Sequence, residues 1–574
     1  MTDTLAPGKP AKLIIDGKAV DAASGETFTT WNPATEEPIC EVSKAGPEDA
    51  NRAVQAARAA YDSGPWGRMR PAERQRLLWK LGDLILEHAD EIARLETLDN
   101  GKPIFESRQI DVPMVANCFH YFSGWATKLT GDTVPVNPAF FTYTLREPLG
   151  VVGAIIPWNF PMIMVGWKAA PALAAGNCVV LKPAQETPLT AVRIGELALE
   201  AGLPPGVLNI LPGPGSSVGA ALVKHPGVDK ITFTGSTEVG KQIMRDCADT
   251  VKKVTLELGG KSPNLVFADA DLDAAVRGAY NGIFYGKGEV CAAGSRLLVE
   301  KGIHDEFLAK LVERAQKLQP ADPLDPKTRL GALVNESQMK KVLGYVETGV
   351  GEGATVAAGG KRRPVNGKGW FVEATVLAGV ANEMRVAQEE IFGPVLAVIP
   401  FDGVDDAVAK ANDIFYGLAS GVWTRDVRRP TSWHAAWRPA RCGSTLTTST
   451  TPACRSVVSR ARASAATWAP RACANTPRSR ASGRASNRGR HVPSHGSAAP
   501  HPRHGTHARV LRAHARPSPR LGWPALDRVS HPRGAAGSAR RRRGGIAIRG
   551  ADARHRRPRG GDRDVARARR TRRR

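Results

Sequence analysis

The chain has 574 residues and a formal net charge of +25, a length that allows two or more domains. The charge is uneven: residues 427–574 hold 36 Arg, 4 Asp and neither Lys nor Glu, whereas residues 1–426 hold 44 Lys plus Arg against 51 Asp plus Glu. Because residues 1–426 carry a slight negative net charge, the charge distribution excludes a uniformly basic nucleic-acid-binding protein. No apolar run approaches the roughly 20 residues that span a membrane.

The predicted elements begin with short strands at 13–20 and 27–31, followed by amphipathic helices at 48–61 and 72–98. From residue 151, short apolar strands alternate with helices, which predicts a parallel sheet with helical crossovers. The runs that carry this prediction are strands at 151–156, 178–181, 207–210 and 230–233, and a helix at 189–201. A strand at 296–300, a helix at 304–318 and a further strand around 395–399 predict a second α/β unit after about residue 261.

A glutamate and a cysteine carry the strongest chemical signal. Glu257 ends a strand-like run before the turn Gly259-Gly260, and Cys291 lies among small residues in GEVCAAGSR. A nucleophile and a separate base are the minimum set for forming and then hydrolysing a thioester. The alternatives are a buried structural thiol and an ion-paired or helix-capping carboxylate.

Three further motifs follow predicted strands. PWNFP holds Asn159 between two prolines, as an oxyanion donor or as a structural turn. VVLKP places Lys182 at a strand end, where it could bind ribose hydroxyls or simply be solvated. ITFTGSTEVG places Gly235, Ser236 and Gly240 at a strand-to-helix turn, which could bind an anion or only cap the helix.

Taken together with EEIFGPV, these motifs resemble the aldehyde dehydrogenase superfamily in order and spacing over about residues 10–429. The resemblance implies an α/β fold with a Rossmann-like cofactor-binding domain and an α/β catalytic domain. The implied boundaries are 1–128 with 149–259 for cofactor binding, 129–148 for part of a small oligomerisation element, 260–429 for catalysis, and 430–574 for a disordered Arg-rich tail.

The resemblance also implies roles for individual residues. Cys291 would form a thiohemiacetal with an aldehyde, Asn159 would hold the oxyanion, and Glu257 would activate the hydrolytic water. The implied cofactor contacts are Lys182, Gln185, Gly235, Ser236, Gly240, Glu390, Phe392 and Trp158. The cofactor would be NAD, and NADP is possible because Gln185 stands where NAD-preferring members usually have Glu. No metal is expected.

The resemblance implies a small-molecule aldehyde substrate and a homodimer or homotetramer. With five cysteines in the body that lack zinc-like spacing, and no signal peptide, we expect a cytoplasmic protein without membrane or specific nucleic-acid partners. A nucleic-acid binder acting through the basic tail is the alternative, but the tail lacks Phe and Tyr and has few Trp residues to stack on bases.

The tail itself has the composition of a GC-rich gene translated in another frame. A shifted codon can be built from the third base of one residue's codon and the first two bases of the next. Read in this way, residues 439–445 permit the sequence Gly-Thr-Val-Trp-Val-Asn, and residues 454–458 permit Pro-Phe-Gly-Gly. Both resemble late motifs of the family in their expected order. The hypothesis is a frame shift near Arg429, which would remove the end of the catalytic domain and the final assembly strand and leave an inactive product.

Overall fold

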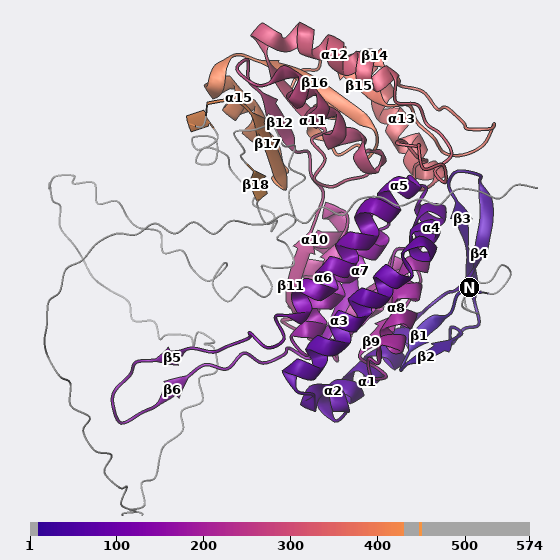
Figure 1. Cartoon of the computed structure of the whole chain (residues 1–574), viewed down its shortest axis with the longest axis vertical. Helices are drawn as coiled ribbons and strands as arrows, with labels where there is room; N and C mark the ends of the chain where they lie inside the picture. The colour runs from indigo at the N-terminus through magenta and orange to yellow at the C-terminus, as the bar shows by residue number, and fades with distance from the viewer. Residues whose placement is uncertain (1–9, 427, 430–446, 450–574) are drawn as a thin grey trace, which may run out of the picture. The chain divides into compact units, whose positions relative to one another are not determined.

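The computed structural model describes residues 10–426, 428–429 and 447–449. The chain divides into two compact units, Met1–Val510 and Leu511–Arg574. The second unit lies outside the described residues. Figure 1 shows that the described elements of the first unit are built around two large sheets.

The first sheet has seven strands in the order β11-β10-β7-β8-β9-β1-β2. They are β1 (Leu13–Ile15), β2 (Lys18–Val20), β7 (Val151–Ile155), β8 (Cys178–Lys182), β9 (Leu208–Ile210), β10 (Lys230–Thr234) and β11 (Lys253–Glu257). Strands β7 to β11 run parallel, and β1 and β2 add an antiparallel edge. Every residue of β7 and β8 is buried, which explains why their sequences are continuously apolar rather than alternating.

The strand order reverses direction between β7 and β10. The chain enters the parallel sheet at β7, adds β8 and β9 on one side, and then adds β10 and β11 on the other. Ligands of open α/β sheets bind beyond the carboxyl ends of the strands at such a reversal. The predicted α/β class with a Rossmann-like sheet is confirmed, and the segments that follow β7 and β10 flank its binding crevice.

Helices pack around this sheet as the amphipathic patterns predict, with one difference. The helices of this part are α1 (Pro47–Asp62), α2 (Pro65–Arg68), α3 (Pro71–Glu87), α4 (Ala89–Asn100), α5 (Ile104–Glu106), α6 (Val112–Ser123), α7 (Pro161–Ala174), α8 (Leu189–Ala201), α9 (Ala220–Lys224) and α10 (Thr237–Ala248). The single helix predicted at 72–98 is two helices separated at His88. Helix α3 packs on α6, α8 and α7, whereas α4 packs on the short π-helix η1 (Ser107–Asp111), α8 and β3, so the two halves share α8 but otherwise bury their apolar stripes against largely different partners.

The predicted strand at 13–20 is a hairpin of β1 and β2. Asp16 and Gly17 form its turn with φ values of 52° and 73°. Two positive φ values in succession are the mark of a tight turn of the Asp-Gly type, whose twist matches that of the flanking strands. The Asp-Gly pair was the local signal for this turn.

The second sheet has the order β14-β15-β16-β13-β12-β17-β18. Its strands are β12 (Pro263–Val266), β13 (Arg296–Glu300), β14 (Thr355–Ala358), β15 (Thr375–Ala378), β16 (Val395–Phe401), β17 (Ala419–Trp423) and β18 (Thr447–Ser449). Its helices are α11 (Leu272–Phe284), α12 (His304–Gln316), α13 (Glu336–Gly351), α14 (Arg385–Gln388) and α15 (Gly403–Asn412). Strand β18 pairs in parallel with β17; the rest of the predicted disordered tail lies outside the described residues.

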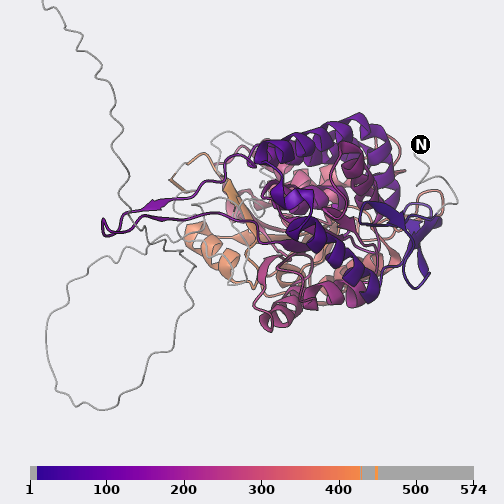
Figure 2. The same cartoon turned by 90° about the horizontal axis from the view of Figure 1, so that it is seen from below.

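Two smaller hairpins complete the described chain. Strands β3 (Thr27–Asn32) and β4 (Glu37–Ser43) form one, and β5 (Thr133–Val134) and β6 (Thr142–Tyr143) form the other. Both views show the β5–β6 hairpin projecting from the body of the first unit (Figures 1 and 2). Among the described residues, no helix is long and apolar enough to cross a membrane.

Candidate functional site

Four predicted site residues lie at the carboxyl edge of the first sheet because each one ends or closely follows a parallel strand. The strands are neighbours, and their register aligns the ends: Ile155 of β7 pairs with Lys182, and Thr234 of β10 pairs with Glu257. The residues brought to this edge are Asn159, Lys182, Ser236 and Glu257. The sheet thus gathers side chains that are nearly one hundred residues apart in sequence.

Cys291 lies between the turn η3 (Tyr285–Gly288) and β13, and its side chain is half-buried. Burial raises the pKa of the thiol to about 12, and the negative charges of Glu390 and Glu257 add to the effect, whereas the backbone N–H groups of Ala292 and Cys291 oppose it. The thiol is therefore protonated at neutral pH. Since the thiolate is the nucleophilic form, attack by this sulfur requires a base.

The turn Gly259-Gly260, which follows the strand that ends at Glu257, packs closely against the Cys291 segment. A Cβ atom on Gly260 would collide with the carbonyl oxygen of Cys291, and one on Gly259 would collide with the carboxylate of Glu390. The backbone N–H of Gly260 donates to Glu390 Oε1 at 3.0 Å. Only glycine permits these close approaches, so the Gly-Gly pair brings Cys291 and Glu390 against the segment that follows Glu257.

Glu257 has the electrostatic character of a general base. Burial raises the pKa of its carboxyl to about 7, and the ammonium group of Lys168 lowers it in part. A base whose pKa is near the working pH transfers protons most effectively. Sequence reasoning missed Lys168, which lies on α7 and is itself buried; the signal was a lone lysine in the apolar helix sequence PMIMVGWKAAPALA.

Asn159 is buried, and its Nδ2 donates to the carbonyl oxygen of Glu289 at 2.8 Å. Glu289 lies two residues before Cys291, so this bond joins the loop after β7 to the cysteine segment. The amide nitrogen carries two N–H groups. The bond therefore fixes the orientation of the amide and leaves a second donor for a ligand.

An aromatic pair links the loops of the two sheets. The rings of Trp158 and Phe392 meet edge to face, with centroids 5.2 Å apart. Phe392 has a φ of 60°, an uncommon conformation for a bulky residue that surrounding contacts must hold. Gln338 Nε2 donates to the carbonyl oxygen of Phe392 at 2.6 Å and supports this conformation.

The remaining predicted cofactor residues differ in their surroundings. Lys182 is buried, and burial lowers its pKa to about 8, so the alternative of a solvated lysine is wrong. Gln185, three residues further along the chain, is half-buried. Ser236 Oγ accepts from the backbone N–H of Val239 and caps α10, while Gly240 packs so closely on Leu258 that a Cβ would collide with it. Gly235 lies in the turn between β10 and α10.

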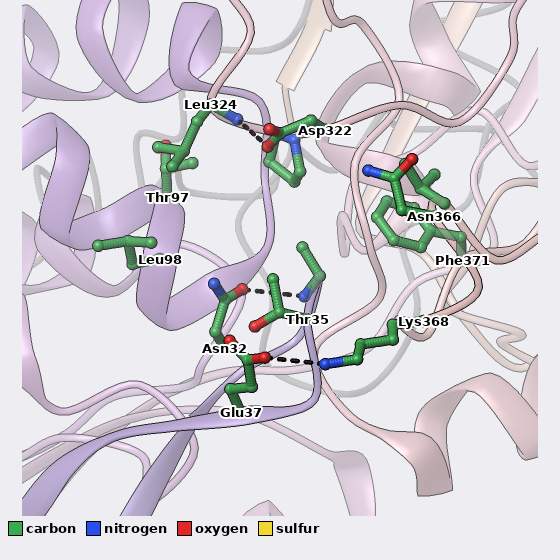
Figure 3. Close-up of a pocket in the computed structure, with 13 residues that line it drawn as sticks. Asn32, Thr35, Glu37, Thr97, Leu98, Asp322, Leu324, Asn366, Lys368 and Phe371 are labelled. Atoms are coloured by element: carbon green, nitrogen blue, oxygen red, sulfur yellow. Dashed lines mark hydrogen bonds and ion pairs between the residues drawn. The ribbon is translucent and has the colours of Figure 1, made fainter.

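A separate cavity of about 320 Å³ lies where the β3–β4 hairpin meets loops near residues 322–324 and 365–371. Figure 3 shows the ion pair that closes one side, in which Lys368 Nζ lies 2.8 Å from Glu37 Oε1. None of the predicted site residues lines this cavity. Within the described ranges, no group of three or more metal-ligating side chains is assembled.

Comparisons with known proteins decide the family. The model of the "Aldehyde dehydrogenase family" matches residues 19–453. The chain belongs to the aldehyde dehydrogenase family. Retinal dehydrogenase 2 of Homo sapiens is 48% identical over 423 residues, which cover 73% of this chain and 81% of that protein. The mitochondrial aldehyde dehydrogenase of Homo sapiens is 48% identical over 418 residues, which cover 72% of this chain and 80% of that protein.

A solved relative extends the likeness to the fold. The NAD+ complex of an aldehyde dehydrogenase from Bacillus cereus superimposes with a TM-score of 0.73 at 46% identity, covering 75% of this chain and 87% of that one. The chain is thus an NAD(P)-dependent aldehyde dehydrogenase, an oxidoreductase that acts on small-molecule aldehydes.

The edge of the first sheet in this dehydrogenase suits a dinucleotide. A Cβ on Gly219 would meet only the side chain of Lys182, at 3.9 Å, so Gly219 lies close to this lysine without crowding it. The N-terminus of α10 presents backbone N–H groups just after the end of β10, which is separated from β8 by β7, and anions are favoured at such a terminus. Lys182 and Glu390 offer a donor and an acceptor for hydroxyl groups. These features fit a ribose–phosphate chain laid along the strand ends.

Proposed function

We propose that this dehydrogenase oxidises aldehydes through a thioester on Cys291. The Cys291 thiol gives up its proton to water and the resulting thiolate attacks the aldehyde carbonyl, and the oxyanion that forms accepts hydrogen bonds from Asn159 Nδ2 and from the backbone N–H of Cys291. Bound NAD(P)+ supplies the hydride acceptor. Glu257 then removes a proton from water, which hydrolyses the thioester and releases the carboxylic acid. The observation that carries this proposal is the convergence of Cys291, Glu257 and the Gly259-Gly260 turn at one sheet edge.

Trapping the acyl group on the protein tests this proposal. The chain is mixed with an aldehyde and NAD+, quenched in acid within one turnover and digested. We expect a mass increase equal to the acyl group on the peptide that contains Cys291, because a thioester is stable in acid. An acyl group on a peptide containing another cysteine would contradict the assignment, as would repeated turnover without any covalent adduct.

We propose that Lys182 and Glu390 contact the two ribose groups, that Gly235, Ser236 and Gly240 form the turn that receives the pyrophosphate, and that Trp158 and Phe392 line the nicotinamide side. NAD is the expected cofactor. The NAD+ complexes of solved relatives support this choice, and NADP stays possible because the amide of Gln185 does not repel a 2′-phosphate as a carboxylate would.

The substitution Gln185→Glu is expected to raise the preference for NAD over NADP, measured as the ratio of the two kcat/KM values. The new carboxylate accepts a bond from the ribose 2′-hydroxyl and repels a 2′-phosphate, and a charge contact of this kind changes the ratio by about tenfold or more. Gln319→Glu, the same change at an exposed position three residues after the end of α12, is the matched control. An unchanged ratio would show that Gln185 does not face the ribose.

We propose that residues 1–128 with 149–259 form the cofactor-binding domain and that residues 260–429 form the catalytic domain. Residues 129–148 form part of a small oligomerisation element. We propose that the 129–148 arm mediates assembly into a dimer or tetramer, because it projects from the body and exposes apolar side chains, with Phe141 70% and Leu145 69% exposed.

A cytoplasmic location is also proposed, on the basis of the free thiols of the described cysteines.

We further propose that the gene is shifted in frame near Arg429, so that the chain as written is an altered product with impaired activity and assembly. The codon pattern of residues 439–458 supports this hypothesis. Sequencing the gene across the codons for residues 420–470 decides the point.

A further inference from the structure

The segment before Cys291 has an unusual backbone that centres on a buried lysine. Gly286, Lys287 and Gly288 have φ values of 58°, 61° and 72° in succession. Two of these positions are glycines, which adopt this region without strain, whereas a lysine there costs conformational energy. Lys287 is also 1% exposed. A strained and buried charge persists only when its contacts hold it.

The ammonium group of Lys287 makes two hydrogen bonds and one ion pair. Nζ donates to the backbone carbonyl of Asn100 at 2.8 Å and to Asn100 Oδ1 at 2.9 Å. It also forms an ion pair with Glu289 Oε2 at 2.7 Å. Asn100 and Glu289 are fully or almost fully buried. The cation therefore joins the end of α4 to the cysteine segment.

Both partners of Lys287 hold the loop that carries Asn159. Asn100 Nδ2 donates to the carbonyl oxygen of Trp158 at 2.8 Å. Glu289 accepts from Asn159 Nδ2 through its backbone carbonyl at 2.8 Å, and its carboxylate accepts from the backbone N–H of Val334 at 3.1 Å. The oxyanion donor is thus fixed on two sides, through its preceding carbonyl and through its own amide.

We propose that Lys287 is a positioning residue for the oxyanion donor: by tying Asn100 to Glu289, its ammonium group holds the amide of Asn159 in the orientation that receives the developing oxyanion. This inference rests on the proposed role of Asn159. Geometry of this kind matters because a donor acts only when it is aimed at the place where negative charge appears. Lys287 does not itself touch the substrate.

Two reagents that react with the Cys291 thiol separate this role from general folding. p-Nitrophenyl acetate acylates the sulfur through a tetrahedral oxyanion and releases p-nitrophenolate. Iodoacetamide alkylates the sulfur by direct displacement of iodide, and no oxyanion forms. Neither reagent needs the cofactor. Rates measured in a Cys291→Ala variant are subtracted to remove reaction at Cys40, which is half-buried, and at other thiols.

The Lys287→Met variant is expected to slow acylation by about 10- to 100-fold, less than the about 10²- to 10³-fold that loss of an oxyanion donor costs. Alkylation is expected to change by no more than about twofold, since the thiol environment is retained. Adding Lys287→Met to Asn159→Ala should slow acylation no further, because two residues that act through one contact are not additive. Lys317→Met, which removes an exposed ammonium paired with Glu313 on α12, is the matched control.

The possible results distinguish the inference from the proposal beneath it. Normal acylation by a folded Lys287 variant overturns the inference, as does equal slowing by both reagents or additivity with Asn159→Ala. Where Lys287→Met does not fold because Glu289 is left unpaired, Lys287→Met combined with Glu289→Gln removes both charges, and the same slow acylation is expected. If Asn159→Ala acylates normally, or the unaltered chain is not acylated at Cys291, the proposed function fails instead.

Discussion

The Cys291→Ala substitution is expected to lower aldehyde oxidation by about four orders of magnitude or more, since removal of the attacking nucleophile in enzymes that form covalent intermediates has effects of this size. Alanine retains the small volume of the half-buried side chain but provides no atom that can bond to the carbonyl carbon. The measurement is steady-state NADH formation, together with binding of NAD+ by titration calorimetry, which should be retained because the proposed cofactor residues are unchanged.

Cys40→Ala is the matched control for this substitution. Cys40 is also half-buried, and burial and the charge of Asp99 raise its pKa to about 12, as for Cys291. Its position on β4 is remote in sequence from every predicted site residue. Oxidation should continue in the Cys40 variant. Turnover that survives in the Cys291 variant at a rate comparable to the unaltered chain would rule out the thioester route.

The Glu257→Gln substitution is expected to slow hydrolysis of the thioester by about 10²- to 10⁴-fold, the usual contribution of a positioned general base. Glutamine has nearly the same shape but cannot accept a proton at neutral pH. Rapid mixing with aldehyde and NAD+ should therefore give a burst of NADH equal to one turnover, followed by a slow steady state. Glu313→Gln, an exposed change on α12, should leave both phases intact.

The pH dependence of the unaltered chain provides a second measure of Glu257. Its pKa is raised to about 7 by burial, against the lowering effect of Lys168, so the carboxylate form predominates only above about pH 7. The hydrolytic step should therefore accelerate as the pH rises through 7 and then level off. This titration should disappear in Glu257→Gln. A burst that is also slowed a hundredfold would instead place Glu257 in the acylation step.

Local sequence patterns predicted the strands that build the site. The runs at 151–156 and 178–181 are apolar over their whole length because their strands are buried on both faces. The residues that follow such strands meet at one sheet edge, so Asn159, Lys182 and Glu257 could be placed near one another. Family resemblance was needed to add Glu390 and Phe392, which lie in the loop between α14 and β16 of the second sheet.

Contacts between distant segments could not be predicted. Lys287 and Asn100 are 187 residues apart and meet only through the packing of α4 against the cysteine segment. The break at His88 was hidden because the apolar period continues through it. Lys168 left a weak signal, as one charge on an apolar helix, but its effect on the pKa of Glu257 depends on tertiary packing that joins segments nearly ninety residues apart. These features depend on tertiary geometry rather than local propensity.

The lysine and glutamate at positions 287 and 289 also constrain how this protein can change over time. Either residue alone, with a neutral neighbour, would leave an uncompensated charge in the interior, which costs several kcal/mol. A viable path to a neutral pair at these positions thus requires both codons to change nearly together, or a prior gain in stability elsewhere. Positions 287 and 289 should therefore covary among related sequences.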